Sequence, residues 1–353
     1  MIALEQMLGE AVARKASDIF IVPGAAPTMK INGVMTRYMD MRLKPEDTAD
    51  IICQIYALAQ SRPQERLLTT GDDDFSFSMK NLGRFRCNAF RQRGTLAAVL
   101  RVVTFGVPDY HTLGVPETVM HLAEVHRGLV LVTGPAGSGK STTLSCLIDR
   151  INDNKAEHIV TIEDPIEYLH PHKKSIVSQR EVEQDTQGYA QALRAALRQA
   201  PDAILLGEMR DFETIQTAIT AAETGHAVFS TLHTIGAAKT IDRMIDVFPA
   251  NQQQQTRVQL SMVLQAVVSQ QLLPTVDGKL TPAFEIMLTN SAIANIIREG
   301  RTHQLDNAIF SGGAQGMVSM DADILRLYKE GKITKETALL YCVNADLMLK
   351  KLG

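Results

Sequence analysis

The sequence predicts a small α+β domain followed by a larger α/β domain that is built on a parallel sheet. Helix-like and strand-like segments are mixed over 1–103, whereas short apolar runs alternate with helix-length segments from Gly128 onward. Between these regions, 104–116 (TFGVPDYHTLGVP) contains two glycines and two prolines in thirteen residues, which is typical of a linker. We therefore expect one domain at 1–103, a linker at 104–116 and a second domain at 117–353.

The first domain begins with apolar residues at helical spacing over 1–16 and a strand over 19–22. Asn32-Gly33 then stands between apolar flanks in MKINGVMTR, which is a strong signal for a two-residue β-hairpin. A helix is expected from Pro45, because apolar residues again recur at helical spacing after it. Further strands are expected in DFSFSM, RFRCNAF and TLAAVLRVV, the first two joined by a turn at KNLG.

The second domain contains short apolar runs that we interpret as buried strands. They are GLVLVTG, HIVTIED, AILLGE and HAVFSTLH, and helix-length segments separate them. This alternation is typical of parallel strands joined by crossover helices. The chain ends in 316–352, which we expect to form two helices joined near EGKIT.

Composition excludes several classes of protein. Hydrophobic residues make up 45% of the 353 residues, which is enough for two packed cores, and the net charge of −3 gives no overall attraction to nucleic acid or anionic lipid. The four cysteines are far apart and include no C-x-x-C pair, so we expect reduced thiols rather than a zinc site or a disulfide framework. The sequence shows no signal peptide and no run of 18 apolar residues. We therefore expect a cytoplasmic protein that reaches a membrane only through a partner.

The segment VTGPAGSGKSTT (132–143) predicts a phosphate-binding loop. The pattern G-x-x-x-x-G-K-[ST] is matched by Gly134, Gly139, Lys140 and Ser141. A strand-like run precedes the segment, and a helix-like run follows it. The glycines allow successive backbone N–H groups to face the phosphates, and the following helix adds its positive end. Lys140 would contact the β- and γ-phosphates of ATP, and the Ser141 hydroxyl would bind Mg²⁺. The residues expected to hold the nucleotide are Gly134, Pro135, Ala136, Gly137, Ser138, Gly139, Lys140, Ser141 and Thr142.

Carboxylates are expected at the C-terminal ends of the neighbouring strands, where ligands bind in open α/β sheets. Glu208 directly follows AILLG, and we expect it to be the carboxylate nearest Mg²⁺ and the γ-phosphate. Glu163 ends HIVTIE and is our candidate to activate the attacking water. Structural alternatives stay open: Glu208 could be a charge at the start of a helix, and Glu163 could belong to a turn closed by Pro165.

Two histidines bracket the strand-like run AVFSTL. His226 and His233 are seven residues apart and would face opposite sides of an ideal strand, so we expect no shared metal. A neutral histidine at a strand end can hydrogen-bond to a phosphate or to a catalytic carboxylate and report the state of the nucleotide. We favour His233 for this role. For each histidine the alternative is a structural hydrogen bond.

The first domain carries a basic segment in which polar and apolar residues alternate along RFRCNA (84–89), so one strand face would be buried and the other would present guanidinium groups. Three interpretations stay open. The arginines could form a solvated face, a nucleic-acid surface, which the net negative charge disfavours, or a set that enters the ATP site of a neighbouring subunit. We favour the third interpretation, with Arg86 and Arg101 as the candidates.

Together these motifs resemble the secretion ATPase superfamily, which drives type II and type IV secretion and type IV pili, and within it the pilus retraction ATPases. The resemblance covers nearly the whole chain. It rests on ASDIFI, DDDFSFSMKNLGRFRCNAFRQRG, GPAGSGKSTT, TIEDPIEYLH, PDAILLGEMRDFETI, GHAVFSTLHTIGAAKTIDRMIDVFP and IREGRTHQLDNAI. It implies a PAS-like N-terminal domain and a RecA-like P-loop ATPase domain, assembled as a homohexameric ring with ATP held between subunits.

The resemblance also implies partners and a location. Hydrolysis around the ring would rotate the domains against each other and turn a polytopic inner-membrane platform protein. Pilin subunits would then leave the base of the filament. This implies a motor in the cytoplasm, at the inner face of the cytoplasmic membrane, with no nucleic-acid partner and no insertion of its own into the membrane.

Several features favour retraction over pilus extension or protein secretion. The extension and secretion relatives usually carry an extra N-terminal region and a four-cysteine zinc element, whereas here the PAS-like part begins at residue 1 and no C-x-x-C pair occurs. Ala294 departs from the retraction motif, because an arginine is usual at its place in AIANIIRE. An accessory retraction motor therefore stays open as an alternative, beside an extension or type II secretion ATPase.

Overall fold

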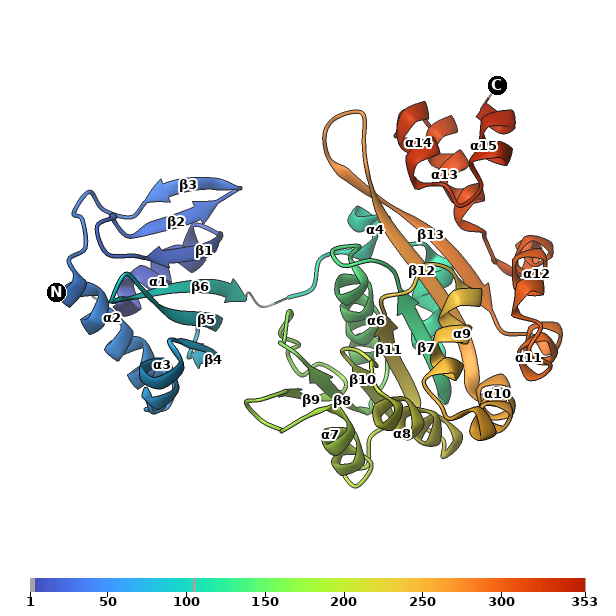
Figure 1. Cartoon of the computed structure of the whole chain (residues 1–353), viewed down its shortest axis with the longest axis horizontal. Coiled ribbons are helices and arrows are strands. Elements are labelled where there is room, and N and C mark those ends of the chain that lie inside the picture. The colour runs from blue at the N-terminus through green and yellow to red at the C-terminus, as the bar shows by residue number, and fades with distance from the viewer. Residues whose placement is uncertain (1–3, 104–105, 353) are drawn as a thin grey trace. The chain divides into compact units, whose positions relative to one another are not determined.

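The computed structural model describes residues 4–103 and 106–352, and the chain divides into two compact units (Figure 1). The first unit runs to Gly106 and includes Glu167–Leu169, and the rest of the chain forms the second. Thr104 and Phe105 of the expected linker lie outside the described residues. The later part of that segment belongs to the second unit and contains the short helix α4 (Tyr110–Leu113). The proposed domain boundaries stay a prediction.

The first unit is built on an antiparallel sheet with strand order β3-β2-β1-β6-β5-β4. Apolar residues of the three helices α1, α2 and α3 pack with one face of the sheet into a single core. The predicted hairpin at Asn32-Gly33 is confirmed, since Ile31 pairs with Val34. The first strand begins earlier than predicted, and α3 has no counterpart among the predicted elements. The elements are α1 (Leu4–Ala13), β1 (Ala16–Ile21), β2 (Thr28–Ile31), β3 (Val34–Arg37), α2 (Pro45–Leu58), α3 (Glu65–Thr70), β4 (Asp72–Met79), β5 (Gly83–Gln92) and β6 (Thr95–Val103).

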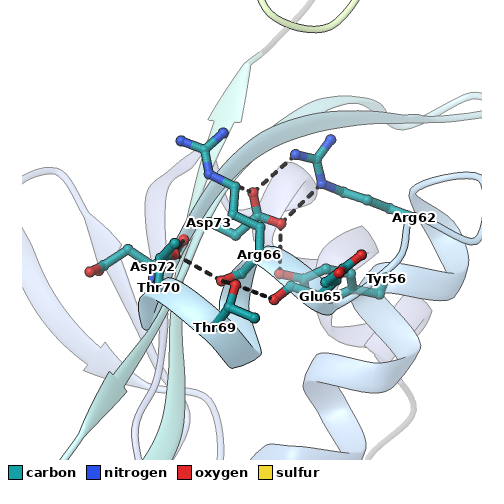
Figure 2. A network of polar contacts seen from close by, with 8 residues as sticks. All are labelled: Tyr56, Arg62, Glu65, Arg66, Thr69, Thr70, Asp72 and Asp73. Atoms are coloured by element: carbon teal, nitrogen blue, oxygen red, sulfur yellow. Dashed lines mark hydrogen bonds and ion pairs between the residues drawn. The ribbon is translucent and has the colours of Figure 1, made fainter.

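A buried carboxylate joins the helices of this unit to its edge strand (Figure 2). Asp73 of β4 accepts a hydrogen bond from Tyr56 Oη at 2.9 Å and two from Arg62, whose Nε and Nη2 each lie 3.0 Å from a different carboxylate oxygen. The Asp73 side chain is fully buried, and the Arg62 side chain is 26% exposed. Burial, and then the neighbouring Asp73, raise the pKa of Tyr56 far above its usual range, so the phenol remains a hydrogen-bond donor.

Replacing Asp73 by alanine is expected to lower the free energy of unfolding by about 3 kcal/mol, because buried hydrogen bonds and the ion pair with Arg62 are lost. Urea denaturation followed by circular dichroism measures the change. Asp74→Ala is the matched control, since Asp74 is the next residue of β4 and is exposed. Its loss should stay below about 0.5 kcal/mol. Equal losses in the two variants would contradict the role assigned to Asp73.

The second unit is built on a mixed sheet with strand order β13-β12-β7-β11-β10-β8-β9. All strands from β7 to β12 run parallel, and β13 runs antiparallel to β12. The four predicted strands are confirmed as β7, β8, β10 and β11. The strands are β7 (Gly128–Thr133), β8 (His158–Glu163), β9 (Ile176–Glu181), β10 (Ala203–Leu206), β11 (Ala227–Leu232), β12 (Leu264–Pro274) and β13 (Leu280–Leu288).

The prediction of a parallel sheet covers the strands from β7 to β12 but misses the antiparallel strand β13 at one edge. β13 returns beside β12 through a tight turn in which Thr275 N donates to Lys279 O at 2.9 Å. So short a connection forces antiparallel pairing, because a parallel partner would need a crossover of a dozen or more residues.

Helices cover both faces of this sheet (Figure 1). One apolar core contains residues of α7 to α12, and the other contains residues of α5, η1 and α6. In the part of the chain that the structure describes, none of the helices has the length and apolar character that a membrane crossing requires. The remaining helices are α5 (Glu117–Met120), η1 (His121–Glu124), α6 (Lys140–Asn154), α7 (Tyr189–Ala196), α8 (Phe212–Glu223), α9 (Ala237–Asp246), α10 (Ala250–Val263), α11 (Ser291–Arg298), η2 (Thr302–Gln304), α12 (Leu305–Ser311), η3 (Gly313–Gln315), α13 (Met320–Lys329), α14 (Lys335–Tyr341) and α15 (Ala345–Leu352).

The prediction of two C-terminal helices is also wrong, because the last segment folds as α13, α14 and α15. Asp321 causes the additional break. Its carboxylate accepts hydrogen bonds from Val343 N at 2.6 Å and from Asn344 N at 3.0 Å, which holds the chain in a turn between α14 and α15. The Asn344 side chain then accepts from Leu347 N and starts α15.

Candidate nucleotide-binding site

The predicted phosphate-binding loop joins the C-terminal end of β7 to the start of α6. Gly134 and Gly139 have φ values of 143° and 88°, which side-chain-bearing residues rarely adopt. A Cβ at Gly134 would also lie 2.1 Å from Gln270 O, and one at Gly139 would lie 2.9 Å from Gln270 Nε2. Backbone conformation therefore favours glycine at both positions, and at Gly134 the backbone of Gln270 also leaves no space for a Cβ.

The loop offers charge and hydrogen-bond donors of the kind that a phosphate needs. Lys140 is only 7% exposed, and its Nζ donates to the carbonyl oxygens of Gly134 (2.9 Å) and Pro135 (2.8 Å). Ser138 Oγ is buried, and no hydrogen-bond partner for it occurs among the described residues. The positive end of α6 points into the same loop. These features fit an anionic ligand whose oxygens accept hydrogen bonds.

The structure brings the two candidate carboxylates together at the C-terminal ends of neighbouring strands. Glu163 ends β8 and is 8% exposed, and Glu208 lies two residues after β10, which pairs with β8. Gly207, the residue before Glu208, packs closely against the backbone of Glu163, since a Cβ on Gly207 would lie 3.4 Å from Glu163 Cα. Neither carboxylate belongs to a helix, and the roles of Glu163 and Glu208 stay a prediction.

Two neighbouring side chains orient Glu163. Its Oε1 accepts hydrogen bonds from Thr161 Oγ1 at 2.6 Å and from Gln179 Nε2 at 3.2 Å. The Gln179 amide is itself oriented, because its Oε1 accepts from His170 N at 2.8 Å. Sequence reasoning missed Gln179, which lies on the edge strand β9 and pairs in register with Thr161.

The two histidines have different surroundings. His233 Nε2 lies 3.5 Å from Glu208 Oε2, and Arg210 Nε donates to the same oxygen at 2.8 Å. The side chains of His233 and Arg210 line a hollow of about 430 Å³ together with Met209, Leu232, Thr234 and Arg243. His226 lies at the other end of β11, where its Nδ1 is 2.9 Å from Ala221 O. Thus His233 meets a candidate carboxylate, whereas His226 makes a local structural contact.

Tyr189 is a further residue at this site that sequence reasoning missed. It begins α7, and a Cβ on Gly207 would lie 2.8 Å from its hydroxyl oxygen. Burial, and then the charges of Glu208, Asp164 and Glu163, raise its pKa far above the usual range. The Tyr189 hydroxyl is therefore a protonated donor beside the carboxylates.

The expected magnesium ligands are hard oxygen donors, which suit this ion. Ser141 supplies a hydroxyl from the first turn of α6, and Glu208 supplies a carboxylate. Within residues 4–103 and 106–352, no three His, Cys, Asp or Glu side chains come close enough to hold a metal ion by themselves. A magnesium ion here would thus need phosphate oxygens and water among its ligands.

The two candidate arginines lie in the first unit, whereas the other predicted site residues lie in the second. Arg86 of β5 stands directly opposite Arg101 of β6, on the sheet face that points away from Phe85, Cys87 and the rest of the core. Arg101 Nε donates to Asp18 Oδ1 at 3.0 Å, and its side chain is 66% exposed. Asp18 of β1 stands opposite Arg101, so this ion pair offsets part of the repulsion between the two arginines.

Known proteins resemble this chain over nearly its whole length. It matches the family described as Type II/IV secretion system protein over residues 1–336. It is 44% identical over 335 residues to the Type IV pilus retractation ATPase PilT of Pseudomonas aeruginosa, which covers 95% of this chain and 96% of that protein. It is also 44% identical over 323 residues to the Twitching motility protein of Neisseria gonorrhoeae, covering 91% of this chain and 86% of that protein.

A solved structure agrees with these sequence relatives. It is described as the crystal structure of the pilus retraction motor PilT and bound ADP, and it superimposes with a TM-score of 0.90 at 46% identity, covering 99% of both chains. The predicted fold class, an N-terminal PAS-like domain with a RecA-like ATPase domain, is confirmed by this match.

Proposed function

The chain belongs to the type II/IV secretion system protein family, and from this premise we propose that it is an ATP-hydrolysing motor that powers retraction of type IV pili. The observation that carries the proposal is the likeness to an ADP-bound pilus retraction motor, with a TM-score of 0.90 over 99% of both chains. The relatives named for pilus retraction and twitching motility support the same activity.

The phosphate-binding loop would hold the phosphates of ATP. The loop N–H groups and the positive end of α6 would face the phosphate oxygens. Lys140 would exchange its contacts with the carbonyls of Gly134 and Pro135 for contacts with phosphate oxygens. Ser141 and Glu208 would hold Mg²⁺, partly through water, and the ion when bound offsets the negative charge of the phosphates.

Glu163 is the residue that we propose to activate water. It would orient a water molecule toward the γ-phosphorus and accept its proton as the bond to the bridging oxygen breaks. The hydrogen bonds from Thr161 and Gln179 restrict its carboxylate to one orientation, which supports this assignment. His233 would report the state of the nucleotide, because it contacts Glu208 and lines the adjacent hollow.

Arg86 and Arg101 would complete the site of a neighbouring subunit in a homohexameric ring. Their guanidinium groups would stabilise the negative charge that develops on the transferred phosphoryl group. Hydrolysis would then depend on assembly, so that each step could move one part of the ring against another. The exposed Arg101 side chain and its position opposite Arg86, on the sheet face away from the core, support this assignment.

The mechanical output would reach the pilus through another protein. We propose that the ring works in the cytoplasm at the inner face of the cytoplasmic membrane and turns an inner-membrane platform protein, so that pilin subunits leave the filament base. The resemblance to pilus retraction ATPases supports this assignment.

Deleting the gene is the direct test. The deletion strain is expected to remain piliated, with pili present in normal or greater number, and to lose twitching motility. Electron microscopy counts the pili, and a surface-spreading assay measures twitching; the wild-type chain supplied on a plasmid should restore it. Loss of pili would instead identify an extension ATPase, and retained twitching would contradict a motor that is required for retraction.

Ala294 favours one second candidate, an accessory retraction motor. The residue lies half-buried on α11, at the place where the retraction motif usually has an arginine. An accessory motor would restore twitching only in a strain that keeps another retraction ATPase, whereas a sole motor would restore it without one. Comparing the two strains therefore separates the candidates.

A further inference from the structure

Gln270 lies on β12 beside the phosphate-binding loop and is 3% exposed. β12 pairs with β7 so that Ser269, the residue before Gln270, stands opposite Thr133 at the end of β7. Three atoms of Gln270 consequently lie near the loop and the first turn of α6. They are its backbone oxygen and, from its side-chain amide, Oε1 and Nε2.

The backbone oxygen of Gln270 packs against the first glycine of the loop. It would lie 2.1 Å from a Cβ on Gly134, which leaves room only for glycine. The backbone of β12 therefore packs along one side of the loop, and its position determines where the loop leaves β7.

The side chain of Gln270 supports the other end of the loop. Thr143 Oγ1 donates to Gln270 Oε1 at 2.7 Å in a buried hydrogen bond. Because this bond fixes the amide oxygen on the side of α6, the amide nitrogen faces the loop, where it would lie 2.9 Å from a Cβ on Gly139. Gln270 thus lies beside Gly134 and Gly139 of the loop and is hydrogen-bonded to the helix that follows them.

We propose that Gln270 is a positioning residue that holds the loop in the shape that binds nucleotide and thereby sets its affinity for a nucleoside diphosphate. The inference rests on the proposed function only in that the loop binds nucleotide; it does not need hydrolysis or retraction. Thr143 acts through Gln270, because its hydroxyl fixes which way the amide points.

The adjacent Gln271 provides a matched control. It too is a buried glutamine of β12, at 8% exposure, but its amide donates to Tyr341 O of α14 rather than to the loop. Gln270→Leu and Gln271→Leu each remove one buried amide of the same strand. A merely structural role would give the two variants the same behaviour.

The test uses the full-length chain, with ADP and Mg²⁺ as the probe in isothermal titration calorimetry. Gln270→Leu is expected to weaken ADP binding about tenfold or more, and Gln271→Leu by less than about twofold. Hydrogen exchange without nucleotide gives a second readout, in which amides of 134–143 should exchange faster in Gln270→Leu only. Equal ADP affinities in the wild type and folded Gln270→Leu, or equal losses in both variants, would overturn the proposal.

Two more variants keep the test decisive if Gln270→Leu does not fold. Gln270→Glu keeps the acceptor for Thr143 but replaces the amide nitrogen with an anionic oxygen, so ADP binding should fall at least as far. Thr143→Val should weaken ADP binding about threefold by itself. Where Gln270→Leu does fold, adding Thr143→Val to it should cause no further loss, because the two side chains act as one unit. Wild-type ADP affinity in Gln270→Glu, or fully additive losses, would contradict the proposal. A wild-type chain that binds ADP but does not hydrolyse ATP would refute the proposed function and leave this inference intact.

Discussion

Alanine in place of Lys140 is expected to lower the rate of ATP hydrolysis about a thousandfold or more. The Lys140 ammonium is the cation that the loop itself supplies, and it is held in place there by the backbone carbonyls of Gly134 and Pro135. In Lys140→Ala the loop N–H groups and the end of α6 remain, so that some nucleotide binding should persist while the charge on the γ-phosphate is no longer stabilised. Phosphate release at saturating ATP measures the loss.

Lys155→Ala is the control for this variant. Lys155 stands at the opposite end of α6, where its Nζ lies 3.6 Å from Glu157 Oε1, and it has no contact with the loop glycines. Its turnover should stay within about twofold of the wild type. Sedimentation should show the same assembly state for both variants. Turnover in Lys140→Ala within tenfold of the wild type would remove the loop from the catalytic site.

The double replacement of Arg86 and Arg101 by alanine is expected to slow hydrolysis by about 10³–10⁵-fold, the range measured for arginines supplied by a neighbouring molecule. ADP binding should be unchanged, because the loop residues remain intact. Neither arginine belongs to the unit that carries the loop. The variant therefore separates charge stabilisation during hydrolysis from nucleotide binding.

Mixing two inactive variants tests whether the arginines act between subunits. Lys140→Ala subunits keep their arginines, and Arg86→Ala/Arg101→Ala subunits keep their loop, so a mixed ring contains some interfaces at which both are intact. Activity should therefore reappear on mixing, with a maximum near equal amounts of the two variants. A mixture that stays inactive although sedimentation shows mixed rings would mean that the arginines serve their own subunit. Arg91→Ala, at the exposed end of β5, is the control and should keep full activity.

Much of the fold could be predicted because its signals are local. The hairpin at Asn32-Gly33 and the strands β7, β8, β10 and β11 each carry a composition or spacing that indicates one conformation. The third C-terminal helix could not be predicted in this way. The break before α15 depends on the Asp321 carboxylate, which lies 22 residues before Val343 in sequence and meets it only in the folded chain.

The residues of the candidate site also fall into two groups, those that local sequence indicates and those that depend on the folded chain. Glu163, Glu208 and the loop could be predicted, because each directly follows a strand-like run and such strand ends gather at one edge of a parallel sheet. Gln179 and Gln270 could not be predicted, because their roles depend on strand order. Only the placement of β9 beside β8 and of β12 beside β7 brings their amides to the site.

The pairing of β12 with β13 affects how C-terminal truncations should be interpreted. Gln270 stands opposite Phe284, whose N–H donates to Asp323 of α13 at 2.9 Å, and Leu273 and Ala283 share an apolar cluster with α13 to α15. A chain that stops before α13 would expose this cluster and loosen the strand that supports the phosphate-binding loop. Loss of ATPase activity in such a truncated protein would therefore report damage to the loop, and could not by itself be attributed to a partner that docks on the missing helices.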